Sequence, residues 1–132
     1  MKQLLPALAI IIFASCKESA TALTEKITGS DSMAINWFKG DGSMDTVISV
    51  QMIRDKSSIN TLAKMAGGYV QKSKPCGYDG SIHFFKMNQV IQDIRFRMND
   101  ASCTQFEFIL DHKPYTTELT AEAKQLLQSL RH

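Results

Sequence analysis

Three short runs of alternating apolar and polar residues follow one another between residues 82 and 110. In residues 82–85, 90–98 and 104–110, apolar side chains recur at every second position, which is typical of strands with one buried face. The links between these runs are short, whereas parallel neighbours require a crossover of a dozen residues or more. The sequence therefore predicts an antiparallel meander of three strands, and this restricts the fold more than any other feature.

Two more alternating segments precede the meander. Residues 33–38 and 47–53 are separated by Gly40, Asp41 and Gly42, which favour a tight turn. We expect these segments to form a β-hairpin.

Two segments have the period of an amphipathic helix. Apolar residues recur at helical spacing over residues 59–66, with Asp55 or Ser57 as N-cap and Gly67 as a stop, and again over residues 123–130 after Thr120. The predicted fold class is α+β: a single antiparallel sheet of about five strands with two helices, in the order ββαβββα. One sheet with helices on one face buries all the apolar stripes together.

The amino terminus has the layout of a secretory signal peptide. Lys2 is followed by an apolar run over residues 4–14, which Pro6 interrupts and Lys17 follows closely. A permanent membrane span needs about 20 apolar residues, so this run is too short. We predict that residues 1–15 are removed on export.

The residues before the first cysteine, Phe13-Ala14-Ser15-Cys16, resemble the signal box of bacterial lipoproteins: an apolar residue, two small residues and a cysteine. The resemblance implies lipidation of Cys16, acylation of the new terminus with palmitate or a similar chain, and retention at the bacterial outer membrane, facing the periplasm or the cell surface. The chain is also similar to small uncharacterised Bacteroidetes lipoproteins. The alternative is an ordinary signal peptide with an incidental Cys16.

Residues 17–32 are rich in Ser, Thr, Lys and Glu and lack a long apolar stripe. This composition predicts a flexible tether, and a short helix around residues 22–27 is the alternative. The expected organisation is a signal peptide over 1–15, a lipidated cysteine with its tether over 16–32, and a small α+β domain over 33–132.

Two cysteines remain after Cys16 is assigned to lipid. Export places Cys76 and Cys103 in an oxidising compartment, where we expect them to form a disulfide. Neither has a second Cys or a His at ligand spacing, so a zinc site or a redox pair is not predicted. No cofactor and no metal are expected.

The sequence contains none of the common catalytic motifs, so we expect the protein not to be an enzyme. A Gly-x-Ser-x-Gly elbow, a His-Glu-x-x-His helix and a phosphate-binding glycine loop are all missing from it. A surface hydrolase built around His83 and His112 is the least favoured alternative. The formal net charge of +2 is too small to indicate a nucleic-acid partner.

The remaining candidates are binding residues. Lys86, Arg95 and Arg97 could share the outer face of the meander and meet a protein or an anionic glycan, while Trp37 and Tyr78 are candidates for exposed apolar contacts. A solvated sheet face is the simpler interpretation. The favoured function is a non-catalytic, membrane-anchored binding module; the alternative is an inhibitor of a secreted or periplasmic hydrolase that presents the loop over residues 72–80.

Overall fold

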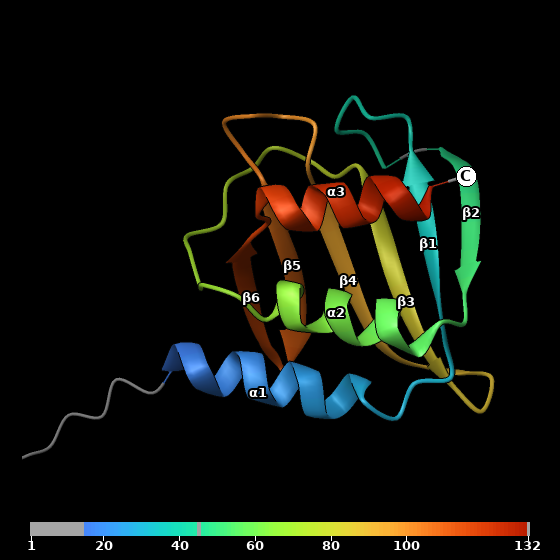
Figure 1. The fold of residues 1–132 in the computed structure, drawn as a ribbon. Coiled ribbons are helices and arrows are strands. Elements are labelled where there is room, and N and C mark those ends of the chain that lie inside the picture. The colour runs from blue at the N-terminus through green and yellow to red at the C-terminus, as the bar shows by residue number, and fades with distance from the viewer. Residues whose placement is uncertain (1–14, 45, 132) are drawn as a thin grey trace, which may run out of the picture.

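Figure 1 shows the computed structural model, which describes residues 15–44 and 46–131, with side chains from residue 21 onward. Residues 1–14 of the predicted signal peptide lie outside this range. The helices are α1 (Ser15–Ile27), α2 (Lys56–Ala66) and α3 (Ala121–Leu130). The strands are β1 (Ser32–Phe38), β2 (Val47–Ile53), β3 (Gly80–Lys86), β4 (Gln89–Arg97), β5 (Gln105–Leu110) and β6 (Lys113–Glu118).

The strands form one antiparallel sheet in the order β2-β1-β3-β4-β5-β6. The predicted α+β class with a single antiparallel sheet is confirmed, as are the hairpin and the meander. The described residues contain six strands and three helices, however, where the sequence predicted about five and two. The two additional elements are α1 and β6.

The segment predicted to be a flexible tether forms α1 instead. Leu23 and Ile27 lie one helical turn apart, and both are fully buried in the core. Two apolar residues four positions apart give too short a stripe to predict a helix over solvated coil. Packing against α2 and the sheet stabilises the helix where intrinsic propensity does not.

The strand β6 was not predicted because Pro114 interrupts its pattern. Proline cannot donate a ladder hydrogen bond and is therefore confined to edge strands, and β6 is indeed an edge strand. A tight turn at Asp111 and His112, whose φ angles are 49° and 66°, returns the chain from β5.

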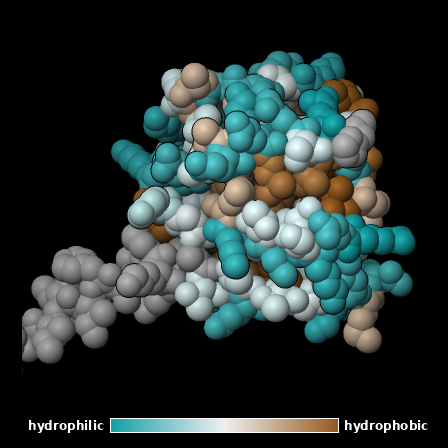
Figure 2. Space-filling view, viewed as in Figure 1, coloured by the Kyte–Doolittle hydropathy of each residue, from teal (hydrophilic) through white to brown (hydrophobic). Residues whose placement is uncertain are grey.

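All three helices pack on one face of the sheet, where α2 and α3 lie in front of the strands and α1 runs along one end (Figure 1). Asp55 and Thr120 cap α2 and α3 through hydrogen bonds to Ser58 N and Ala123 N, as predicted. Figure 2 shows apolar side chains between α2 and α3 on this face. On α3, Leu126 and Leu130 are partly buried and pack against the core.

A buried ion pair fastens the beginning of β3 to the end of β4. The Asp79 carboxylate accepts hydrogen bonds from Arg97 Nη1 at 2.7 Å, Met98 N at 2.7 Å and Asn99 N at 2.8 Å. Asp79 is 1% exposed and Arg97 is 9% exposed. Arg97 was predicted to lie on a solvated binding face, and this prediction is wrong because its guanidinium neutralises an interior carboxylate.

The disulfide between Cys76 and Cys103 is present, with the Cα atoms 6.4 Å apart, as predicted. It joins the loop before β3 to the segment before β5. The Gln105 side chain reinforces this link, since Nε2 donates to Lys74 O at 2.9 Å while Oε1 accepts from Lys74 N at 3.2 Å. The loop is therefore held at two neighbouring points.

Replacing both cysteines by alanine should lower the free energy of unfolding by about 3.5 kcal/mol, because the unfolded chain regains the entropy of a loop closed between residues 27 positions apart. Urea unfolding followed by circular dichroism measures the change. The matched control is wild-type protein unfolded in the presence of a reductant. It should unfold at the same urea concentration as the double variant. Equal stability of the oxidised wild type and the double variant would contradict the prediction.

Asp79→Asn should lower the free energy of unfolding by about 3 to 5 kcal/mol, because it leaves the Arg97 charge buried without its counter-ion. Asp93→Asn is the matched control: its carboxylate is exposed, so the loss should stay below about 1 kcal/mol. The same urea titration distinguishes the two variants. Similar losses of unfolding free energy in both variants would show that the buried pair contributes no more to stability than an exposed one.

Candidate functional site

The face of the sheet opposite the helices carries a hollow of about 530 Å³. Its polar side chains come from β3, β4 and β5, and Lys26 of α1 also lines it. Apolar lining residues include Phe38, Met44, Val90 and Ile109. The hollow continues into the gap where β4 and β5 stop pairing beyond Arg95 and Glu107.

Three side chains in the hollow form a continuous hydrogen-bonded chain. Ser81 Oγ lies 3.3 Å from His83 Nε2, and His83 Nδ1 lies 2.5 Å from Asp93 Oδ1. Carboxylate oxygens only accept, so in the neutral imidazole Nδ1 carries the proton and Nε2 accepts from the serine hydroxyl. A serine, an imidazole and a carboxylate are thereby linked in the order that nucleophilic catalysis uses.

A β-bulge brings Asp93 opposite His83. At the turn end of the β3–β4 hairpin, Lys86 pairs with Gln89, and this register would place Gln92 opposite His83. The register shifts by one residue between Phe84 and Phe85, so His83 pairs with Asp93 instead. Bulges commonly redirect side chains in this way. The carboxylate faces the imidazole because of one extra residue in β4.

A second polar cluster adjoins the first. The Tyr78 hydroxyl donates to the Glu107 carboxylate, and the Arg95 guanidinium lies over the Tyr78 ring at 4.6 Å. Burial, and then the hydrogen bond to Glu107, raise the pKa of Tyr78 above its usual value. Tyr78 therefore remains a neutral donor. Tyr78 and Arg95, both predicted as binding residues, do come together here.

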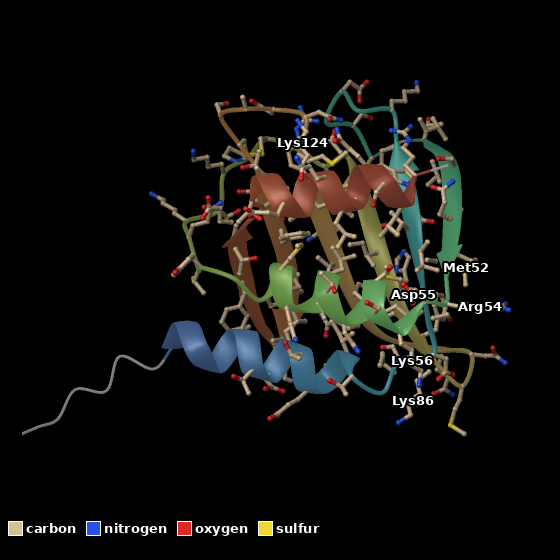
Figure 3. The ribbon with its side chains drawn as sticks, in the orientation of Figure 1. Met52, Arg54, Asp55, Lys56, Lys86 and Lys124 are labelled. Atoms are coloured by element: carbon tan, nitrogen blue, oxygen red, sulfur yellow. A yellow bond between two sulfur atoms is a disulfide. The ribbon has the colours of Figure 1, made fainter. Side chains whose placement is uncertain are left out.

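The other predicted binding residues do not join them. Lys86 is exposed at the far end of β3, about 16 Å along the strand from Ser81. Figure 3 shows it at the same end of the sheet as Arg54 and Lys56. The three predicted basic residues thus do not form one patch, because Arg97 is buried and Lys86 lies away from Arg95.

Trp37 was predicted to be an exposed apolar contact, and this prediction is wrong. Its side chain is 1% exposed and packs edge-on against Phe96 at 5.4 Å between ring centroids. Gly80 makes room for this pair, because a Cβ there would lie 2.4 Å from the Phe96 ring. Trp37 belongs to the core under the helices.

The sequence reasoning did not identify Ser81 and Asp93 as functional candidates. Ser81 and His83 are two positions apart on a strand and therefore share a face, which the alternation of residues 82–85 already indicated. Asp93 was expected on the outer face of its strand, as observed, but its place opposite His83 depends on the bulge. His112, the other histidine considered for hydrolysis, is exposed in the β5–β6 turn and is not among the residues that line the hollow.

Within the described ranges, no group of three His, Cys, Asp or Glu side chains is placed to hold a metal ion. Nor is any helix among these residues long and apolar enough to cross a membrane. The Cys16 side chain lies outside what the structure describes. Comparison with known families, with curated proteins and with solved structures found no match to this chain.

Proposed function

We propose that the chain is a lipoprotein anchored in the bacterial outer membrane and that it acts as a binding module. The observation that carries the binding proposal is the state of β2, an edge strand with a row of exposed apolar side chains. Ile48, Val50 and Met52 are 49%, 55% and 53% exposed and share the face opposite the helices. Such a row on an edge strand favours pairing with another chain.

The two edges of the sheet differ in a way that supports this assignment. Strand β6 contains Lys113, Pro114 and Glu118, and the segment over residues 69–71 covers it through Gln71 N–Thr116 O and Glu118 N–Tyr69 O hydrogen bonds of 2.8 and 2.9 Å. Strand β2 has no charged residue and no proline. Within the described residues no strand pairs with its outer side. Only one edge therefore lacks the usual protection.

The chemistry of β2 indicates the partner. An unpaired strand edge offers main-chain donors and acceptors, and the exposed row offers apolar contact. An extended, apolar segment of a protein partner satisfies both. An anionic glycan or a nucleic acid would require positive charges that β2 does not have.

The sequence Phe13-Ala14-Ser15-Cys16 resembles a lipoprotein signal box, and this resemblance supports the anchor. Cys16 lies within α1. Two or more acyl chains hold a protein stably on a membrane, whereas one binds only reversibly. The domain would thus lie beside the membrane in which its cysteine is anchored.

Inhibition of a secreted hydrolase is a second candidate, favoured by the geometry of one loop. Lys72 to Pro75 are exposed, while Lys74 is held by Gln105 and the adjacent Cys76 by its disulfide. A rigid, exposed loop costs little ordering entropy when it binds. The partner would then be a secreted or periplasmic hydrolase that binds the loop over residues 72–80.

Cys16→Ser should release the protein from the membrane fraction and abolish incorporation of a palmitate analogue, because the thiol that would carry the lipid is gone. Fractionation of cells that express the full chain measures both effects. Cys76→Ser is the matched control and should remain in the membrane. Unchanged membrane retention of Cys16→Ser would refute the anchor.

A photo-crosslinking residue at Val50 should give a protein adduct in cells that express the full chain, whereas one at the exposed Gln125 on α3 should not. Introducing Ile48→Lys beside the Val50 probe should reduce the adduct at least tenfold, because the new charge would have to be buried. Gel electrophoresis and mass spectrometry measure the adduct. The same adduct from both positions would contradict the β2 surface. An adduct from a third probe, placed at Lys72, with none from Val50 would favour the inhibitor.

A further inference from the structure

The geometry points to a second activity on the sheet face opposite the helices: we infer that Ser81 is a nucleophile that His83 activates and that the hollow accepts carboxylic esters with an apolar acyl group. This inference departs from the sequence-based expectation of a protein without catalysis. It needs neither the lipid anchor nor the β2 partner. It uses other residues, on β3 and β4.

The hydrogen-bond directions within the site are consistent with this role. Asp93 fixes the proton on His83 Nδ1, which leaves Nε2 free to accept from Ser81 Oγ. Asn36 Nδ2 donates to Ser81 Oγ from the neighbouring strand at 3.4 Å. The serine oxygen therefore has a donor on one side and a base on the other.

The position of the serine also fits. Ser81 is 8% exposed at the base of the hollow, so its hydroxyl is shielded from most bulk water. Asp93, by contrast, is exposed and contacts the imidazole on the side away from Ser81. Electrostatic effects are stronger in a water-poor site, and a nucleophile at its base meets only substrates that enter the hollow.

The lining of the hollow defines the substrate class. Phe38, Met44, Val90 and Ile109 form apolar walls beside the reacting group, which suits the hydrocarbon part of an acyl chain. The volume of about 530 Å³ is within the range of small-molecule sites. Asn36 is a neutral donor that hydrogen-bonds to the Ser81 oxygen.

The reaction balances with these groups alone. Ser81 Oγ forms a bond to the ester carbonyl carbon while its proton passes to His83 Nε2, and the C–O bond to the leaving alcohol breaks as that proton is returned to the alkoxide. Water then adds to the acyl-serine by the same proton path. The products are one carboxylic acid and one alcohol, and Ser81 is restored.

Asp93 acts through His83 and is a positioning residue. Its carboxylate keeps the proton on Nδ1 and holds the ring toward Ser81. The bulge at Phe84 and Phe85 is what brings it opposite His83. Asp93→Asn should therefore lower the kcat for p-nitrophenyl butyrate and leave its KM and the unfolding midpoint unchanged.

The test is covalent labelling of the purified full-length chain with a fluorophosphonate, a reagent that bonds to activated serines. Peptide mass spectrometry should locate one adduct on Ser81. His83→Gln, which keeps a polar side chain on the strand, should slow labelling by about 100-fold or more, because general-base assistance is worth roughly that factor. Ser81→Ala should abolish both labelling and release of p-nitrophenol.

Ser73→Ala is the matched control, because the Ser73 hydroxyl donates to the Glu107 carboxylate at 2.7 Å and not to an imidazole. It should be labelled at the wild-type rate. Absence of an adduct on wild-type Ser81, or equal labelling rates in wild type and His83→Gln, would overturn the inference. Circular dichroism of His83→Gln shows whether a lost adduct reflects chemistry or unfolding.

Discussion

The Asp79 carboxylate and the Arg97 guanidinium form a buried ion pair at 2.7 Å. Asp79 also links three strands through hydrogen bonds. Besides its side-chain bonds, Asp79 accepts a backbone hydrogen bond from Phe38 and donates one to Phe96 O. It thereby joins β1, β3 and β4 at one end of the sheet. A buried charge costs several kcal/mol unless it is paired and hydrogen-bonded, and here a guanidinium and two backbone amides satisfy the carboxylate.

This pair also fixes the loops around it. Arg97 Nη1 donates to Gly40 O at 3.4 Å, and Tyr78 N donates to Gly42 O at 3.1 Å, so the β1–β2 loop and the loop before β3 lie against the same charge. Gly77 has a φ of 76°, and a Cβ there would meet Gly42 O at 2.2 Å. The close approach of the two loops places Tyr78 beside Arg95, at the rim of the hollow. Tyr78, at the rim of the hollow, and Asp79, in the buried ion pair, are therefore consecutive residues of the loop before β3.

Much of the fold was predictable because its signals are local. The alternation of residues 82–110 specified the meander, and the caps Asp55 and Thr120 marked where α2 and α3 begin. What the sequence did not reveal depends on long-range contacts. Helix α1 is stabilised because Leu23 and Ile27 are buried in the core. Arg97 is buried because it pairs with the buried Asp79 carboxylate. Asp93 lies opposite His83 because a bulge shifts the register. None of these contacts leaves a periodic trace in the chain.

Helix α1 has a mechanical consequence for the proposed anchoring. A flexible segment over residues 16–32 would have an end-to-end distance of about 23 Å, and the domain could move that far from the bilayer. From Cys16 to the buried Leu23 the chain is helical, which spans only about 10 Å. A domain lipidated at Cys16 would thus stay close to the bilayer surface. It would diffuse laterally along the membrane, and a partner could bind it only close to the membrane surface.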